Sequence, residues 1–153
     1  MSKLNVIKFF KDKNFDVNIV ELKDSATVLK AAEGLGVKTN DIAKTLAFHV
    51  ADEVIVVVMS GDARVDNKKY KQFFNTKAKM LNFEEVEEST GHPVGGVCPF
   101  GLKNGVKVYL DASLESLDYV YPAAGEFNCA LKIKPVDIEK LTDATWIDVC
   151  EIR

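Results

Sequence analysis

The strongest constraint on the fold is a pair of neighbouring segments, residues 45–50 and 54–59, that are rich in β-branched and aromatic residues. Residues of these types favour extended strands. The polar step Ala51-Asp52-Glu53 between the two segments is typical of a tight turn. The sequence therefore predicts a β-hairpin, and this hairpin is its clearest predicted element.

Helical signals surround the hairpin. Apolar residues at helical spacing predict a helix over residues 3–13. Ser25 and Thr27 offer cap oxygens before an Ala-rich segment, 28–35, which Gly36 can terminate. Other segments with helical signals are 65–74, 82–88 and 135–141, and other segments with strand signals are 17–22, 106–110, 118–121, 129–133 and 146–152.

The order of these elements defines the predicted fold class. Helices and strands alternate without a regular βαβ repeat, so we predict a mixed α/β fold in which helices surround a curved, barrel-like mixed β-sheet. The 153 residues contain no repeat and no linker long enough to separate domains. We therefore expect a single domain over residues 1–153.

Composition excludes several function classes. The net charge is −3, from 20 basic and 23 acidic residues, which argues against binding along a length of nucleic acid, DNA included. No signal-peptide pattern opens the chain, and no apolar run approaches the roughly 18 residues needed to cross a bilayer, so a cytoplasmic protein is expected. The three widely spaced cysteines and two distant histidines favour reduced thiols over a disulfide or zinc site.

Lys44 is the first candidate functional residue. It opens the predicted strand and, by strand alternation, shares a face with Leu46 and Phe48. A lysine at the end of a core-facing row either extends its ammonium to water or points it into a cleft at the rim of the core. The pattern alone leaves both interpretations open.

The second candidate is the loop 91–101, which holds four glycines and two prolines and cannot form a regular helix or strand. Its glycines allow a ligand to approach the main chain closely, and backbone N–H groups at Gly95 and Gly96 are suited to bind a carbonyl oxygen that becomes an oxyanion. The alternative is a structural turn between two elements. The absence of GxxxxGK[ST] argues against a nucleotide-binding loop.

Two further patterns have both a structural and a functional interpretation. Asp111 follows a predicted strand and either caps the next segment or lies at a cleft rim near Lys44. Small residues at 123–125 leave room for a ligand. A nucleophile made of Cys98 and His92 is conceivable, but the thiol lacks an orienting partner in the sequence. Five lysines form either a solvated helix face or an RNA footprint: Lys68, Lys69, Lys71, Lys77 and Lys79.

Several of these segments together resemble the YbaK/ProX family, which is related to the editing domain of bacterial prolyl-tRNA synthetases. The resemblance spans roughly residues 20–140. It rests on the ordered set Ser25-Ala26-Thr27, Ile42-Ala43-Lys44-Thr45-Leu46, Gly95-Gly96-Val97-Cys98-Pro99, Leu110-Asp111-Ala112-Ser113-Leu114, Ala124-Gly125 and Leu131-Lys132-Ile133-Lys134-Pro135. The segment Gly95 to Gly101 is similar to the GGVxPFG loop of the YeaK-like branch, which is linked to seryl, threonyl or alanyl esters.

The resemblance implies a trans-editing hydrolase that removes small amino acids such as Ser, Thr or Ala from the acceptor end of mischarged tRNA. It implies no cofactor, no metal and no covalent enzyme intermediate, and a synthetase is a further expected partner. It implies catalytic roles for Lys44, Gly95 and Gly96, and substrate contacts from Ser25, Thr27, Val97, Pro99, Asp111, Ser113, Ala124 and Gly125. Ala124 stands where some relatives carry a histidine, so no histidine-assisted step is inferred. The alternative is a non-catalytic module that binds charged tRNA or a synthetase.

Overall fold

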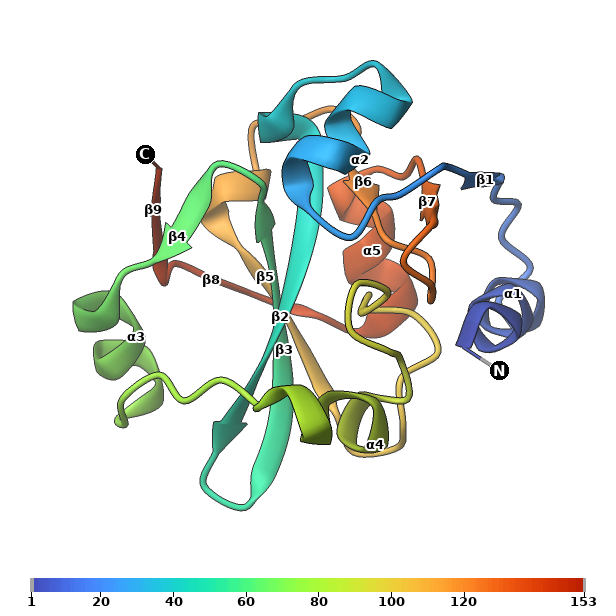
Figure 1. Ribbon diagram of the computed structural model, residues 1–153. Helices are drawn as coiled ribbons and strands as arrows, with labels where there is room; N and C mark the ends of the chain where they lie inside the picture. The colour runs from blue at the N-terminus through green and yellow to red at the C-terminus, as the bar shows by residue number, and fades with distance from the viewer. Residues whose placement is uncertain (1, 153) are drawn as a thin grey trace.

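A computed structural model describes residues 2–152 of the protein. Its centre is a five-stranded mixed sheet in the order β6-β2-β3-β5-β8. The sheet comprises β2 (Ile42–Val50), β3 (Glu53–Ser60), β5 (Lys107–Asp111), β6 (Tyr121–Pro122) and β8 (Thr145–Ile147). β2 and β3 form the predicted antiparallel hairpin, whereas β6 runs parallel to β2, β5 to β3, and β8 to β5. Figure 1 shows β2, β3 and β5 crossing near the middle of the molecule as the sheet twists.

Two antiparallel two-stranded sheets flank the main sheet. One pairs β1 (Ile19–Glu21) with β7 (Cys129–Leu131), and the other pairs β4 (Ala63–Val65) with β9 (Cys150–Ile152). These small sheets lie on opposite sides of the main sheet in Figure 1. The predicted mixed α/β class with a mixed sheet and surrounding helices is confirmed, and the described strands do not close into a barrel.

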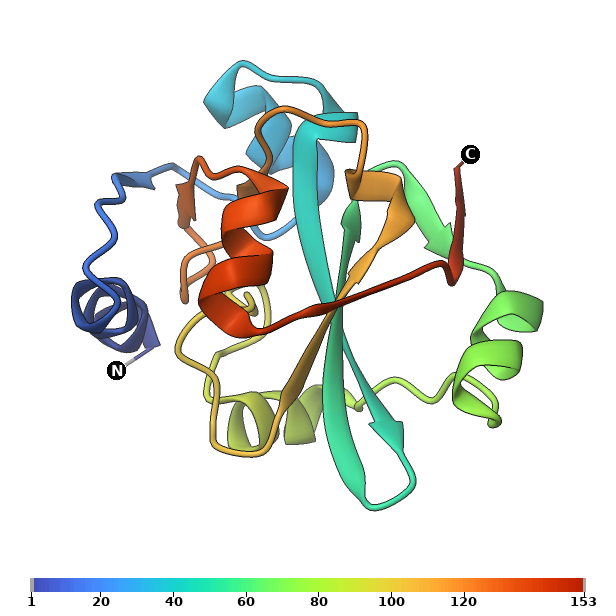
Figure 2. The same cartoon turned by 180° about the vertical axis from the view of Figure 1, so that it is seen from behind.

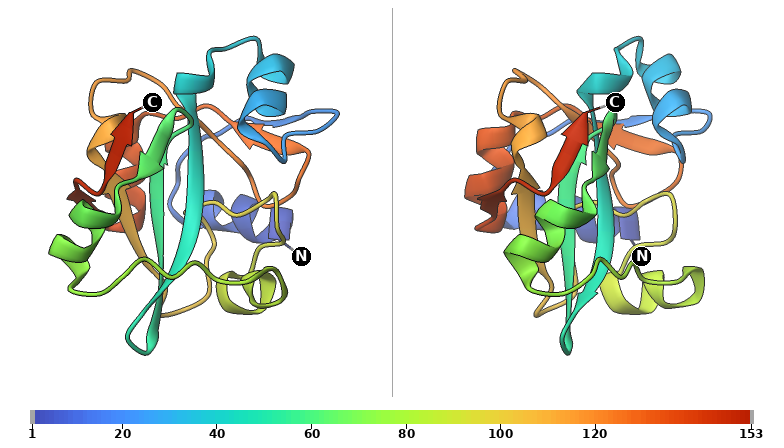
Figure 3. Two further views of the ribbon diagram at one scale, coloured as in Figure 1. Left: turned by 60° about the vertical axis from the view of Figure 1, so that its left-hand side comes forward. Right: turned by 90° about the vertical axis from the view of Figure 1, so that its left-hand side faces the viewer.

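Five α-helices surround the sheet, with short 3₁₀ turns at η1 (Thr39–Asp41), η2 (Phe83–Glu85) and η3 (Ala112–Leu114). In the right-hand view of Figure 3, α3 lies in front of the sheet, α2 and α4 lie on the side of β2, and α5 lies on the opposite side. Figure 2 shows α5 from behind, next to the chain that leads into β8. The helices are α1 (Ser2–Asp12), α2 (Val28–Leu35), α3 (Asn67–Phe74), α4 (Val86–Thr90) and α5 (Pro135–Thr142).

The helix caps follow the predicted chemistry. The hydroxyl of Thr27 accepts a hydrogen bond from the N–H of Lys30 at the start of α2, and Gly36 ends that helix with a φ of 70°. Asn82 and Glu85 form a capping box at η2, in which each side chain accepts from the other residue's backbone N–H. The predicted cap residues Thr27 and Gly36 are therefore confirmed.

The hydrophobic core divides at the sheet because alternate residues of a strand point to opposite faces. On one face, Ala43 and Ala47 of β2 join a cluster that includes Phe10 and Ile138. On the other face, Phe48 packs in a cluster with Tyr70 and other buried side chains. No helix between residues 2 and 152 has the length and apolarity needed to span a membrane.

Two strand predictions differ from the structure. The strand expected over 118–121 is reduced to Tyr121–Pro122, and Val120 forms instead an isolated antiparallel bridge with Ile133. The edge strand expected over 146–152 is divided into β8 and β9. It is interrupted where the N–H of Val149 donates to the buried carboxylate of Asp111 instead of to a strand.

Candidate functional site

A cavity of about 310 Å³ lies against β2, between α2, α4 and the loop 91–101. Most of its wall is small and apolar, with a few polar groups. The lining side chains and backbone belong to Ser25, Ala26, Thr27, Val28, Ala31, Ile42, Ala43, Lys44, Thr45, Leu46, Ala47, Met80, Leu81, Val86, Val94, Gly95, Val97, Tyr121, Ala123 and Ala130. A cavity of this volume is at the lower end of the range for small-molecule sites.

The cavity lies where the edge of β2 is uncovered. β6 pairs only with Ile42 and Ala43, and farther along the strand the N–H of Leu81 donates to the carbonyl of Ala47. Residues 44–46 therefore pair with no strand on this side. Because outward-facing backbone groups alternate along an antiparallel strand, the N–H and C=O of Thr45 point outward like the carbonyl of Ala47. The cavity wall thus contains one free backbone donor and one free backbone acceptor.

Lys44 lines the cavity with a half-buried side chain. Its ammonium nitrogen lies 3.5 Å from the carbonyl oxygen of Gly61. Burial lowers the pKa of Lys44 below its usual value, and the neighbouring Arg64 lowers it further, while Asp62 opposes the shift. The lysine is therefore not extended into open solvent, and its charge is incompletely compensated.

Thr45 contributes a second unusual group. Its side-chain oxygen is buried and has no hydrogen-bond partner within the described chain, although the residue lines the cavity. A buried hydroxyl without a partner costs about 1–3 kcal/mol. A bound molecule that reaches this hydroxyl would remove that cost, because a rotation about the Cα–Cβ bond is enough to turn the hydroxyl toward the cavity.

The loop 91–101 has a defined turn where it meets the cavity. The N–H of Gly96 donates to the carbonyl of Pro93 at 2.9 Å, and Gly95 adopts a φ of 89°. The N–H of Gly96 therefore already has a backbone acceptor in this structure. Gly95 and Val97 line the cavity, and neither N–H has an acceptor within the described residues.

Gly96 has a packing role. A Cβ atom on this residue would lie 2.5 Å from the backbone of Gly125 and Glu126. The N–H of Gly125 also donates to the carbonyl of Gly96. The loop is therefore pressed against the segment that follows Ala124, and only glycine fits at residue 96.

His92 and Cys98 belong to the loop 91–101 but do not line the cavity. The ring of His92 is fully buried, with Nε2 2.6 Å from the carbonyl oxygen of Phe100 and Nδ1 bonded to the hydroxyl of Ser2. Since Nε2 must donate to that carbonyl, it cannot take a proton from the Cys98 thiol, 3.6 Å away. Burial also raises the pKa of Cys98 to about 12. This geometry disfavours a thiol nucleophile.

The remaining sequence-predicted residues divide into two groups. Ser25, Thr27 and Val97 line the cavity, and the hydroxyl of Ser25 donates to the carbonyl of Phe127. The others do not line it: Pro99, Asp111, Ser113, Ala124 and Gly125. The carboxylate of Asp111 is buried and accepts from the N–H groups of Ser113 and Val149, which corresponds to its capping interpretation.

Sequence reasoning missed the residues that complete the cavity from distant segments. Met80, Leu81 and Val86 form one wall, and Tyr121 and Ala130 form another. They are ordinary apolar residues, so no motif in the sequence marks them. Among the five lysines considered as an RNA footprint, Lys69 lies on α3 and forms an ion pair with Asp148 at 3.1 Å. Within residues 2–152, no group of three or more metal-ligating side chains is placed to hold a metal ion.

Comparisons with known proteins place this geometry in context. Residues 23–141 match the family model of the aminoacyl-tRNA editing domain. The chain is 45% identical to the uncharacterized protein YwhH of Bacillus subtilis, across 99% of this chain and 98% of that protein. It is 28% identical to EbsC of Enterococcus faecalis, a candidate Cys-tRNA(Pro)/Cys-tRNA(Cys) deacylase, across 83% of this chain and 79% of that one.

A solved structure supports the same relationship. The crystal structure of a candidate trans-editing enzyme for prolyl tRNA synthetase superimposes with a TM-score of 0.90. The match has 28% sequence identity and covers 98% of this chain and 97% of that chain. The two proteins therefore share the fold over nearly their whole lengths.

Proposed function

The chain belongs to the aminoacyl-tRNA editing domain family, and from this premise we propose that it hydrolyses the ester between a small amino acid and the 3′ end of mischarged tRNA, acting in trans. The observation that carries the proposal is the small, largely apolar cavity at the uncovered edge of β2, with Lys44 in its wall. Such an activity complements synthetases, because a binding pocket discriminates small apolar differences by only about 1–3 kcal/mol.

The proposed chemistry uses groups already present in the cavity wall. An aminoacyl ester is activated, so water attack needs orientation and stabilisation of the developing negative charge on the carbonyl oxygen. The N–H groups of Gly95 and Val97 are the proposed donors to that oxygen. The ammonium of Lys44 holds the terminal phosphate or orients the nucleotide, and the neighbouring ribose hydroxyl positions the water.

The proposed substrates are esters of small amino acids, such as Ser, Thr or Ala. Ala31, Ala43 and Ala47 leave space for a short side chain but not a long one. The uncompensated hydroxyl of Thr45 favours an amino acid that can hydrogen-bond to it. Ser and Thr therefore fit this cavity better than Ala does.

The test is hydrolysis of a panel of tRNAs mischarged with Ser, Thr, Ala and Cys. We expect wild type to deacylate one or two members, and Lys44→Ala to lower kcat/KM by about 100-fold or more, as expected for the loss of a charged group that positions the substrate. Lys8→Ala is the matched control, since Lys8 is exposed on α1 and pairs only with Asp12.

Each alternative result has a definite meaning. Equal rates for wild type and Lys44→Ala would remove Lys44 from the mechanism. If the protein bound charged tRNA but hydrolysed no member of the panel, the result would favour a non-catalytic module that sequesters charged tRNA. Neither result would change the family relationship, because that rests on the sequence and the fold.

A further inference from the structure

Phe83 is the most exposed large apolar side chain among the described residues, at 74% of its full accessibility. It lies in η2, between Leu81 and Val86, and both of these neighbours line the cavity. Met80, 55% exposed, also lines the cavity. The chain therefore places an unburied phenyl ring beside one wall of the proposed site.

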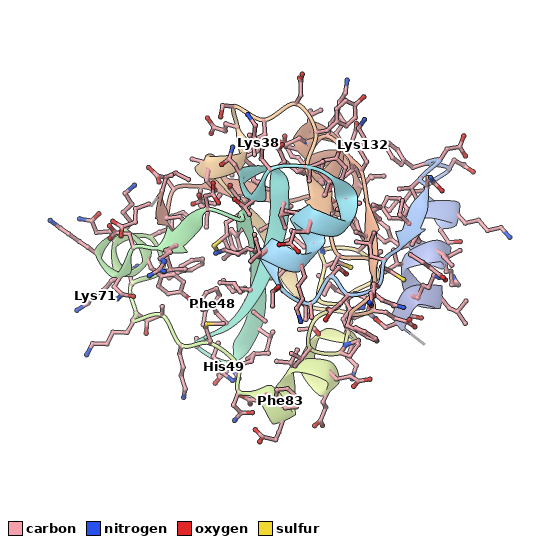
Figure 4. All side chains as sticks on the ribbon, turned by 45° about the horizontal axis from the view of Figure 1, so that its top comes forward. Lys38, Phe48, His49, Lys71, Phe83 and Lys132 are labelled. Carbon is pink, nitrogen blue, oxygen red and sulfur yellow. The ribbon has the colours of Figure 1, made fainter. Side chains whose placement is uncertain are left out.

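The turn that carries Phe83 is firmly held. Asn82 and Glu85 bracket it with their reciprocal capping hydrogen bonds, at 3.0 and 2.9 Å. Glu85 is also 3.0 Å from Nε2 of His49, a residue of β2. Figure 4 shows Phe83 and His49 close together near the lower end of β2. A ring presented on such a turn loses little conformational entropy when a ligand binds against it.

The volume of the cavity indicates which part of the substrate meets this ring. At about 310 Å³, the cavity is at the lower end of the range for small-molecule sites, so we place the aminoacyl group and its sugar inside it and the base of the terminal nucleotide outside it. Aromatic side chains bind unpaired bases by stacking, and this contact is tolerant of base identity. The pKa of Glu85 is lowered mainly by the backbone hydrogen bond from Asn82 and then by the contact with His49, and the charge of Lys79 adds only a small contribution. Because η2 itself carries Glu84 and Glu85, the contact expected at Phe83 is with an uncharged base and not with a phosphate.

From this arrangement we infer that Phe83 is a stacking platform for the terminal nucleobase of the tRNA 3′ end. The inference rests on the proposed function, because it assigns the base to the same substrate whose ester lies in the cavity. Phe83 is then a binding residue: it holds the nucleotide and takes no part in the bond that breaks.

The probe is a 3′-aminoacylamino-adenosine, in which an amide that resists hydrolysis replaces the ester. We expect Phe83→Ala to raise its Kd by about 5- to 50-fold, the range expected for the loss of one base–aromatic stack. Phe83→Trp should restore binding, and its indole fluorescence should be quenched by the adenosine probe but not by a ribose analogue that lacks the base. The matched control is Phe73→Ala, on α3, where the exposed ring packs against Phe74 and Tyr109.

The outcomes separate this inference from the proposed function. Suppose that wild type hydrolyses charged tRNA but Phe83→Ala binds the probe with the same Kd as wild type. The stacking role is then overturned, and the hydrolase proposal is retained. If no charged tRNA is hydrolysed but the probe binds and requires Phe83, the stacking role stands and the hydrolase proposal fails. An equal loss in Phe73→Ala, or base-independent quenching in Phe83→Trp, would also overturn the inference.

Discussion

At the scale of single residues, Lys44 and Thr45 each leave a polar group incompletely satisfied at the cavity. The ammonium of Lys44 is half-buried beside Arg64, and the hydroxyl of Thr45 has no partner in the described chain. Such groups destabilise a fold unless a bound molecule compensates them. The two side chains leave β2 on opposite faces, so each is a separate indication that a bound molecule compensates a polar group here.

Thr45→Val tests which amino acid the cavity prefers. Valine has nearly the same shape but its side chain cannot form hydrogen bonds. The variant should therefore keep its folded structure but lose selectivity between seryl and alanyl esters. We expect kcat/KM for Ser-charged tRNA to fall by about 10-fold or more, and that for Ala-charged tRNA to change by less than about 3-fold. The measurement is single-turnover deacylation of both substrates, and a parallel decline for both would assign Thr45 a purely structural role.

Lys44→Met tests the stability cost of the buried charge. A lysine whose pKa is lower in the folded than in the unfolded state destabilises the fold at all pH values below that pKa, and the penalty disappears as the pH rises above about 10.5. At pH 7 the variant should therefore be slightly more stable than wild type while losing activity, the gain being small because solvent screens a half-buried charge. Urea unfolding at pH 7 measures this difference, and a loss of stability would contradict it.

At the scale of elements, the contact between the loop 91–101 and the segment after Ala124 forms one side of the site. Gly96→Ala would place a methyl group 2.5 Å from the backbone of Gly125 and Glu126. Because the opposing atoms belong to the main chain and cannot rotate away, we expect the free energy of unfolding to fall by about 1–3 kcal/mol or more. We also expect the rate of tRNA deacylation to fall. Gly34→Ala in α2 is the control: its Cβ meets only the side chain of Leu22, at 3.4 Å, and should stabilise the helix by up to about 1 kcal/mol. Similar unfolding midpoints for the two variants would refute this account.

Elements with strong local signals are predictable from the sequence, and those that depend on distant partners are not. The hairpin of β2 and β3 and the capped helix α2 are specified by their own residues, so their predictions are confirmed. β4 is a three-residue strand that exists because it pairs with β9, and it carries no pattern of its own. The same limit applies to the site: Lys44 and Gly95 have distinctive contexts, whereas Met80 and Tyr121 are brought to the cavity only by the folded chain.

At the scale of the whole molecule, the hydrogen bond between His92 and Ser2 joins α1 to the back of the loop 91–101. Burial lowers the pKa of His92, so its imidazole stays neutral in the folded protein below pH 6.5, where the unfolded chain takes up a proton. The resulting stability is present above pH 6.5 and is lost as the pH falls through the lower folded pKa.

We therefore expect the free energy of unfolding to fall as the pH is lowered from 7.5 to 5.5. The decrease should be at most about 1.4 kcal/mol, which is the value for the one pH unit between 6.5 and 5.5. His92→Gln should be less stable at pH 7.5 and should show a smaller decline. Urea denaturation at the two pH values measures both quantities. His49→Gln is the comparison, because His49 is partly exposed, and an equal change of slope in that variant would argue against His92 as the source.

The uncovered stretch of β2 has a consequence for how the protein behaves in a crowded solution. An unpaired strand edge is a template on which the edge of another chain can add, and such pairing leads to aggregation. Here the open stretch is limited to residues 44–46, with β6 covering the strand on one side of it and the segment around Leu81 on the other. Within this stretch only the N–H and C=O of Thr45 point outward, so an added strand would gain few backbone hydrogen bonds there. The short length of the gap therefore leaves room for a small molecule at the cavity while limiting edge-to-edge association of the sheet.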